Sequence, residues 1–304
     1  MVVYNVFSHC VSYKYKAYFC SKATLILIII SVLSVLFPVI FTYRSHGFWL
    51  RTDTYQEQPQ VYFKYDYLLI ADTTSQGNLI ICSNLPRHAE LSTSLSACPF
   101  VKAQEDDSNR DGYNDVLHFS ANVVLPSDLS LHGITLLLFF DYKLTSYCRV
   151  QMEAVAVVQH SSPLAGAGLV VVADLSLVQR QPLSPRHTHI QYNTSTGQSA
   201  NPFNLPRLLS QYALRNVSAR LTNQYAIWQT GPVAGEPFVV DATIVYAEAT
   251  VRYKPSPWQQ LRLGWAQFLP ILIISVLIFR AIKSFIFTNQ LVHTYCDKPW
   301  QSVH

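Results

Sequence analysis

One acidic segment, "EDDSNRDGYNDVLHF" (residues 105–119), carries oxygen-bearing side chains at the alternating spacing of a calcium-binding loop. Side-chain and main-chain oxygens at such intervals bind Ca²⁺, and Gly112 permits the sharp turn that wraps the chain around the ion. The candidate ligands are Asp107, Asn109, Asp111 and Asp115.

An EF-hand sensor requires a bidentate glutamate at the twelfth loop position and a helix after the loop. Counted from Asp107, the twelfth position is His118, and "VLHFSANVVL" reads as a strand rather than a helix. We therefore expect a loop between strands, with two alternatives: it holds one structural calcium ion, or it is an unliganded acidic turn.

The sequence contains no recognised catalytic signature. G-x-S-x-G, H-E-x-x-H, a Walker loop and paired Cys-x-x-Cys motifs are all missing. The small net charge of +4 arises at the two chain ends, so no basic patch of the nucleic-acid-binding kind is present between them. We expect no catalytic residues, no small-molecule substrate and no nucleic-acid partner.

Two apolar segments are long enough to cross a membrane. Residues 23–43 contain no charge and would span about 31 Å as a helix, against a hydrocarbon core of about 30 Å. Residues 263–279 are followed by Arg280 and Lys283, whose long side chains can reach lipid headgroups. The alternatives are a cleaved signal peptide for the first segment and a buried core helix for the second. We expect transmembrane helices at 23–43 and 263–283.

Charge and glycosylation motifs indicate that both ends are cytoplasmic. The first 22 residues contain three lysines and no acid, and beyond Phe279 three cations accompany Asp297 alone. The two N-glycosylation sequons, at Asn193 and Asn216, both lie between the spans, which places that segment in the lumen or outside the cell. The basic ends also favour contact with the anionic cytoplasmic leaflet.

The cysteines allow at most one disulfide between the spans. Cys82, Cys98 and Cys148 lie there, and spacing alone leaves their pairing open. Cys20 precedes the first span and Lys22 by two residues, so it is a candidate for S-palmitoylation, with an ordinary juxtamembrane thiol as the alternative.

The segment between the spans has the pattern of an antiparallel sandwich. In "VYFKYDYLLI" (61–70), alternation predicts one face formed by every second residue from Val61 through Tyr65 to Leu69. Residues 237–253 are similarly rich in β-branched and aromatic side chains, and further strand-like segments separated by turn clusters lie between these two.

Two apolar segments inside this region need separate interpretations. "ITLLLFF" has only seven apolar residues before Asp141, too few to cross a membrane, so we expect a strand. "PFNLPRLLSQYALRN" favours a modest helix with one apolar face. The residues of that face are Leu205, Leu208, Leu209 and Tyr212.

These features together predict a membrane protein in which two transmembrane helices flank a mainly antiparallel, β-sandwich-like lumenal or extracellular domain. The expected segments are a cytoplasmic N-terminus at 1–22, a transmembrane helix at 23–43, the β-rich domain at 44–262, a transmembrane helix at 263–283 and a cytoplasmic C-terminus at 284–304.

Several motifs resemble those of the transmembrane protein 231 family of the ciliary transition zone, nearly from end to end. The most specific is "RSHGFWL" (44–50), directly after the first span. The other motifs are "FSH" and "FCSKA" before that span, "YQEQP" (55–59), "DSNRDGYNDVLHF" (107–119), "QPLS" (181–184), "YNTS" and "RNVS" at the sequons, and "FTNQ" (287–290).

The resemblance implies a non-enzymatic membrane component of the Meckel syndrome and B9 complex, located in the ciliary membrane at the transition zone. The implied partners are tectonic and B9-domain proteins and other membrane proteins of that zone. The implied role is a diffusion barrier that controls ciliary membrane composition and supports ciliogenesis and Hedgehog signalling. The tail "HTYCDKPWQSVH" departs from the family pattern, so no partner is assigned to it.

Two other classes of protein share the expected topology. A two-span ligand-gated channel usually has many ectodomain disulfides, and the second span here offers few polar pore residues beyond Gln267 and Ser275. A glycosylated accessory subunit of a transporter would have identical topology, and the sequence does not separate it from a ciliary component.

Overall fold

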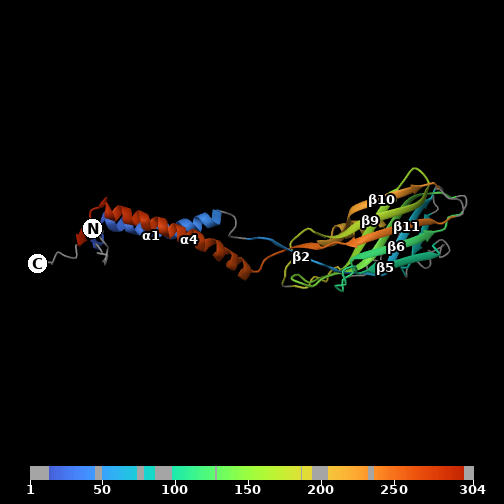
Figure 1. Cartoon of the computed structure of the whole chain (residues 1–304), viewed down its shortest axis with the longest axis horizontal. Helices are drawn as coiled ribbons and strands as arrows, with labels where there is room; N and C mark the ends of the chain where they lie inside the picture. Colours follow the sequence, from blue (N-terminus) through green and yellow to red (C-terminus); the bar gives the residue numbers. More distant parts are fainter. Residues whose placement is uncertain are drawn as a thin grey trace, which may run out of the picture. The chain divides into compact units, whose positions relative to one another are not determined.

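The computed structural model describes residues 14–44, 50–73, 79–85, 98–126, 129–185, 187–193, 205–231 and 236–297. The chain forms two compact units (Figure 1). One contains both chain ends and their long helices, and the other is the β-rich domain, Thr52–Pro255.

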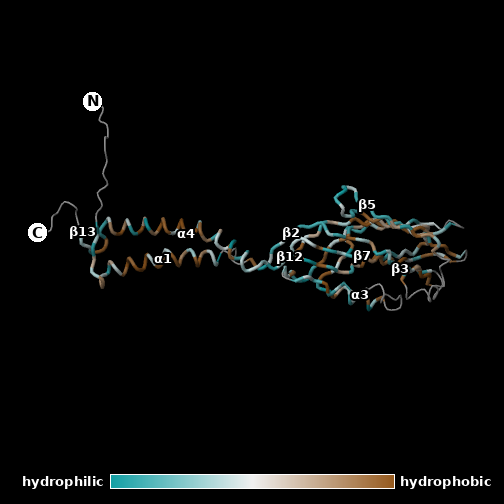
Figure 2. The backbone as a smooth tube through the Cα atoms, turned by 90° about the horizontal axis from the view of Figure 1, so that it is seen from below, coloured by the Kyte–Doolittle hydropathy of each residue, from teal (hydrophilic) through white to brown (hydrophobic). Residues whose placement is uncertain are grey.

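The helical unit consists mainly of α1 (Lys22–Arg44) and α4 (Pro257–Thr288), which run side by side and are both long and apolar enough to cross a membrane (Figures 1 and 2). Their outward side chains are largely apolar and exposed, as lipid-facing side chains are. Gly264 and Ser275 are small buried residues of α4, and the rings of Phe37 of α1 and Phe279 of α4 meet edge-on with centroids 6.3 Å apart.

Both helices are longer than the apolar segments that predicted them. α1 exceeds 23–43 by one residue at each end, whereas α4 begins at Pro257 and ends at Thr288 instead of covering 263–283. The start of α4 follows a capping signal: the Ser256 hydroxyl accepts a hydrogen bond from the Gln259 amide at 3.3 Å, and proline occupies the first helical position. The hydropathy of the sequence identifies only the apolar part of each helix, so the polar turns at the helix ends were not included in the predicted ranges. Where the bilayer begins along α4 stays a prediction.

A short ladder joins the two ends of the chain within the helical unit. Strand β1 (Lys14–Lys16) pairs antiparallel with β13 (Tyr295–Asp297), with Tyr15 opposite Cys296. The ring of Tyr18 also meets that of Tyr295 edge-on at 5.9 Å. This pairing was not expected, because three-residue strands carry no periodic signal in the sequence.

The β-rich domain contains a five-stranded sheet in the order β10-β9-β11-β6-β5, a four-stranded sheet in the order β4-β3-β7-β8, and the small pair β12-β2. Pairing is antiparallel throughout these sheets except between β9 and β11. The strands are β2 (Asp53–Glu57), β3 (Gln60–Thr73), β4 (Leu79–Ser83), β5 (Phe100–Asp106), β6 (Val116–Val123), β7 (Leu131–Leu144), β8 (Val150–Ser161), β9 (Gly166–Gln179), β10 (Val217–Thr230), β11 (Phe238–Tyr246) and β12 (Ala249–Tyr253).

The two larger sheets pack face to face around one apolar core, which confirms the predicted sandwich-like arrangement (Figure 1). Aromatic rings cross the interface: Phe63 of β3 meets Phe119 of β6 at 6.2 Å, and Phe140 of β7 meets Tyr246 of β11 at 6.0 Å. Such edge-on pairs add to the stabilisation that burial of the rings provides.

The predicted helix with one apolar face is present as α3 (Leu205–Ala213), and it covers the outer face of the four-stranded sheet. Leu208 and Tyr212 are buried against side chains such as Leu137 and Phe139 of β7. Strand β7 is therefore buried on both faces, which explains why its sequence is a continuous apolar run instead of an alternating one.

One expectation for β3 is wrong. Tyr65 does not share the buried face of Val61 and Leu69, because the pairing of β3 with β7 shifts between Phe63 and Tyr67. Tyr65 adopts φ of 60° at this bulge and is 61% exposed. Phe63 pairs with Phe140 and Tyr67 with Leu138, so the bulge inserts two residues into β3 and the alternation resumes on the same face beyond it. Val61, Phe63 and Leu69 therefore share the core, and Tyr65 turns outward within the bulge.

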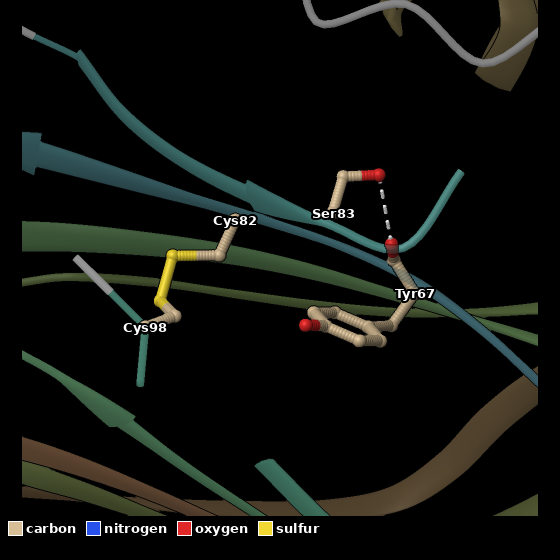
Figure 3. The surroundings of a disulfide bond; sticks show 4 residues. All are labelled: Tyr67, Cys82, Ser83 and Cys98. Carbon is tan, nitrogen blue, oxygen red and sulfur yellow. Dashed lines mark hydrogen bonds between the residues drawn. A yellow bond between two sulfur atoms is a disulfide. The ribbon is translucent and has the colours of Figure 1, made fainter. Parts of the chain in front are cut away.

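A disulfide between Cys82 and Cys98 resolves the cysteine pairing (Figure 3). Cys82 lies in β4, at one edge of the four-stranded sheet, and Cys98 lies two residues before β5, at one edge of the five-stranded sheet. The bond, with Cα atoms 6.1 Å apart, thus links edges of the two sheets. Cys148 keeps a buried free thiol.

Candidate functional site

The acidic segment forms the connection between β5 and β6, which confirms that it lies between strands and is not followed by a helix. Asp106 pairs with Val116 at the end of the ladder, and the Asp115 amide donates to the Asp106 carbonyl at 2.9 Å. The Asp115 carbonyl in turn accepts from the Tyr246 amide of β11 at 2.7 Å, so three strands fix the base of the loop.

The carboxylates of this loop bind main-chain amides of the same loop. Asp107 accepts from Arg110 N at 2.6 Å and from Gly112 N at 2.9 Å, through different oxygens. Asp111 Oδ1 accepts from Tyr113 N at 2.8 Å. The remaining bonds are Asn109 Nδ2 to Asp111 Oδ2 at 2.9 Å, Asp111 N to Asn109 Oδ1 at 2.9 Å, Ser108 N to Asp115 Oδ2 at 3.0 Å and Asn109 N to Asp115 Oδ2 at 3.4 Å.

This network requires unusual backbone at two positions. Gly112 has φ of 88° and Arg110 has φ of 61°. An added Cβ at Gly112 would meet no neighbouring atom within 4 Å, so the need for glycine is conformational and not steric crowding by other residues. The glycine predicted to allow a sharp turn does so.

The loop holds the four predicted calcium ligands close together. Their side-chain oxygens already accept hydrogen bonds from groups of the loop itself. Over the described parts of the chain, no group of three or more His, Cys, Asp or Glu side chains is arranged to hold a metal ion. Calcium binding by this loop therefore stays a prediction, beside a second role that the geometry shows: the carboxylates cap the amides of the turn.

The two predicted glycosylation residues are connected through Tyr192. Asn193 directly follows it and is exposed. The Asn216 amide donates to the Tyr192 hydroxyl at 3.2 Å, and the Tyr192 ring lies 5.3 Å from the Arg215 guanidinium carbon. Both asparagines are thus held near the same point of the β-rich domain, although residues 194 and 195 of the first sequon lie outside the described part.

Asn216 is only half-buried, and its side chain is held by one hydrogen bond. Its Oδ1 accepts from the Gln181 amide at 2.9 Å. A glycan attaches to the side-chain nitrogen, so this bond through the oxygen is compatible with modification. Ser218, the hydroxyl residue of this sequon, is buried at the start of β10. If Asn216 is glycosylated, the transferase must therefore bind the Ser218 hydroxyl before β10 packs into the sheet.

Cys20, the lipidation candidate, is exposed in the turn before α1. The turn is ordered by Thr24, whose hydroxyl donates to the Tyr18 carbonyl at 2.7 Å. Accessibility of the thiol is consistent with acylation, and the modification stays a prediction.

Sequence reasoning missed a charged cluster near α3. Lys64 of β3 forms an ion pair with Glu153 of β8, whose side chain is only 3% exposed. Partial burial raises the pKa of Asp66, Lys64 lowers it, and Glu153 raises it further. Arg215 donates to the Glu153 carbonyl at 3.1 Å. No local spacing signals this cluster, because its members come from three separate segments.

Fold and sites together define a class: a two-helix membrane protein whose long central segment forms a β-sandwich domain with a single disulfide among its described cysteines. The model of the family "Transmembrane protein 231" matches residues 1–296. The chain belongs to this family, as its motifs predicted.

Relatives with that name match along nearly their full length. The protein from Xenopus tropicalis is 38% identical over 298 residues, which cover 97% of this chain and 96% of the relative. The proteins from Bos taurus and Homo sapiens are 38% and 36% identical over 299 residues, covering 97% of this chain and 95% of each relative. Among solved structures, a proton-activated chloride channel aligns over 87% of this chain and 99% of its own at 9% identity and a TM-score of 0.29, a likeness too weak to carry any conclusion.

Proposed function

We propose that this protein is a non-enzymatic membrane component of the tectonic and B9 protein complex at the ciliary transition zone. There it contributes to the diffusion barrier that controls which membrane proteins enter and leave the cilium, and thereby supports ciliogenesis and Hedgehog signalling. The observation that carries the proposal is family membership along the whole chain, from before the first span to residue 296.

The proposed arrangement places both chain ends in the cytoplasm and the β-rich domain outside the cell or in the lumen. The lysine-rich start of the chain and the paired sequons support this orientation. A disulfide in the β-rich domain supports it independently, because disulfides persist in oxidising compartments and are rare in the cytosol.

A scaffold role is favoured over a pore by the second span. Gln267 and Ser275 are the polar residues of 263–279 that a pore could use. Gln267 is exposed, whereas Ser275 is buried in the unit where α4 lies against α1. A residue buried between helices cannot also line an aqueous path in that arrangement. An accessory subunit of a transporter would have the same topology, so only an experiment can distinguish that function from the proposed one.

The experiment is performed in ciliated cells with the protein tagged at either end. The proposal expects the tag between basal body and axoneme, tectonic and B9-domain proteins among its proximity-labelled neighbours, and altered ciliary membrane composition after complete knockout. A neighbourhood dominated by one transporter would support the accessory-subunit class instead. Unchanged ciliary composition in a knockout without a compensating homologue would contradict the proposal.

A further inference from the structure

A cavity of about 440 Å³ lies between α1 and α4 near the start of α1 and the end of α4. This volume is within the range of about 300–1,000 Å³ that is usual for small-ligand sites. The residues that line it are Tyr15, Leu27, Arg280, Lys283, Ser284, Phe287 and Thr288. All of them belong to the helical unit, so the cavity does not depend on how the β-rich domain is placed.

The α4 wall of this cavity follows helical spacing. Arg280, Lys283, Ser284, Phe287 and Thr288 recur at intervals of three and four residues, so their side chains share one face of the helix. This face therefore presents two cations, two hydroxyls and one aromatic ring to the same space. Nearer the start of the same helix, residues 263–279 carry no charge, so we expect the cations to lie at the boundary of the hydrocarbon layer.

The opposite wall comes from the other end of the chain. Tyr15 of β1 approaches Phe287 with ring centroids 6.5 Å apart, and the β1-β13 ladder holds it there. Leu27 of α1 adds an apolar surface on the lipid side. The cavity thus has a cationic part and an apolar part, the same division as in a phospholipid near its headgroup.

The charge of the cavity is not neutralised by the protein. Among the residues that the structure describes, neither Arg280 nor Lys283 has a carboxylate partner. Arginine and lysine at the membrane boundary bind phosphate oxygens through charge-assisted hydrogen bonds. A phosphomonoester carries a charge of about −1.5 to −2 at neutral pH, which matches two cations better than a singly charged headgroup does.

We propose that this cavity binds the headgroup of a phospholipid that carries a phosphomonoester, with Arg280 and Lys283 as the phosphate ligands. The hydroxyls of Ser284 and Thr288 supply further hydrogen-bond donors, and the acyl chains extend along the apolar surface that begins at Leu27. The inference does not rest on the ciliary role, since it uses only the geometry of the helical unit.

The test measures lipid retention by the full chain in detergent micelles, using native mass spectrometry. The probes are phosphatidylinositol 4-phosphate, phosphatidylserine and the free headgroup inositol 1,4-bisphosphate. The test variant is Arg280→Gln with Lys283→Gln. The matched control is Arg44→Gln with Arg262→Gln, which also removes two positive charges, one at the end of α1 and one near the start of α4, away from the cavity.

The proposal expects the test variant to bind phosphatidylinositol 4-phosphate at least about tenfold more weakly, since loss of two charge-assisted bonds exceeds the 1.4 kcal/mol that corresponds to a tenfold change. The control variant should stay within about twofold of the unmodified protein, because it leaves the phosphate contacts intact. A third variant, Ser284→Phe, keeps both cations but fills the cavity, and it should also lose binding. Loss in the test variant but not in Ser284→Phe would mean general charge attraction and would overturn the site.

Two other results would overturn the assignment. Equal retention of phosphatidylserine would remove the preference for a phosphomonoester. Equal binding of the free headgroup would identify a soluble phosphate compound as the ligand, in place of a lipid. Unchanged helix content by circular dichroism in all variants would show that the helical unit, which contains every substituted residue, is still folded.

Discussion

Carboxylates of the β-rich domain bind main-chain amides where the strand ladders are interrupted. Glu105 accepts from Phe63 N at 2.8 Å at the bulge of β3 and from the Tyr246 hydroxyl at 2.7 Å. Glu57 Oε1 accepts from Thr145 N and Ser146 N at 2.8 Å each. An unpaired buried amide costs about 1–3 kcal/mol, so Glu105 stabilises the part-buried bulge, whereas Glu57 orders a turn whose residues are exposed.

One substitution in the acidic loop distinguishes calcium binding from the capping of main-chain amides. Asp111→Asn retains an oxygen that can accept from Tyr113 N, but it removes one negative charge from the proposed site, and the charge of the ligands sets the affinity for calcium. If the loop holds calcium, saturation at about 100 times Kd should add roughly 2.7 kcal/mol of stability, and this increment should be smaller in Asp111→Asn because calcium binds more weakly. Thermal unfolding of the full chain with calcium or chelator measures it.

The control for this measurement is Asp111→Ala, which loses both the charge and the amide bond. It should be less stable than Asp111→Asn even in chelator, by about 1 kcal/mol for the lost hydrogen bond. Identical unfolding midpoints of the unmodified protein with calcium and chelator would mean that the segment is an acidic turn only.

Asp66 gives a pH-dependent prediction. Its pKa is raised by partial burial in the folded protein, so the folded state holds this proton more tightly than the unfolded state does. Proton binding by Asp66 therefore stabilises the folded protein below the ordinary aspartate pKa of about 3.9. This stabilisation is lost as the pH rises through the raised pKa of the folded state. Asp66→Asn should then raise stability at neutral pH by a few tenths of a kcal/mol, because solvent screens much of the effect.

The measurement compares unfolding midpoints of Asp66→Asn and the unmodified protein at neutral and acidic pH. The difference should shrink on acidification. Asp72→Asn, at an exposed position of the same strand, is the control and should show little change at either pH. A difference that grows on acidification would refute the assigned direction.

At the scale of elements, the two sheets of the sandwich are joined at both edges, by a disulfide at one edge and by hydrogen bonds at the other. On one side the Cys82–Cys98 disulfide joins the edges formed by β4 and β5. On the other, the buried Tyr212 hydroxyl of α3 accepts from Val155 N of β8 and Ala219 N of β10, each at 3.0 Å, and donates to the Ala219 carbonyl at 2.9 Å. Burial raises the pKa of Tyr212, so the hydroxyl keeps its proton and continues to donate.

Removal of this hydroxyl should weaken the sandwich. Tyr212→Phe leaves the two edge amides and one carbonyl without their partner while it keeps the aromatic ring, so we expect a loss of about 2–4 kcal/mol in unfolding free energy. Tyr225→Phe removes a hydroxyl from an exposed tyrosine of β10 and should cost less than about 0.5 kcal/mol. Chemical denaturation of the two variants provides the comparison, and equal stability of both would contradict the role given to Tyr212.

Elements with strong periodicity could be predicted from the sequence, and features set by distant partners could not. The apolar face of α3 and the long run of β7 identified a helix and a buried strand correctly. The bulge at Tyr65 could not be predicted, since the acid that supports it, Glu105, is 42 residues from Phe63. The β1-β13 pair and the Cys82–Cys98 bond likewise depend on which segments meet in space.

For the candidate sites the same division applies. The turn at Gly112 was predicted because the local spacing determines it. The cluster around Glu153 and the cavity around Arg280 were not, because each combines residues from separate segments. The loop and the sequons could therefore be identified from local sequence patterns. The cluster around Glu153 and the cavity around Arg280 could be identified only from the structure.

At the scale of the whole molecule, the central claim is that two spans place the β-rich domain across the membrane from both chain ends. The ciliary proposal assumes this arrangement, with both chain ends in the cytoplasm. The most direct measurement combines glycosidase treatment with protease protection in sealed microsomes, for the unmodified protein and for Asn193→Gln with Asn216→Gln.

The account predicts that glycosidase increases the gel mobility of the unmodified protein and leaves the double variant unchanged. Added protease should remove tags at both chain ends while the β-rich domain stays protected. Protected tags at the ends together with a digested β-rich domain would contradict the account, because that result requires the opposite orientation of both helices.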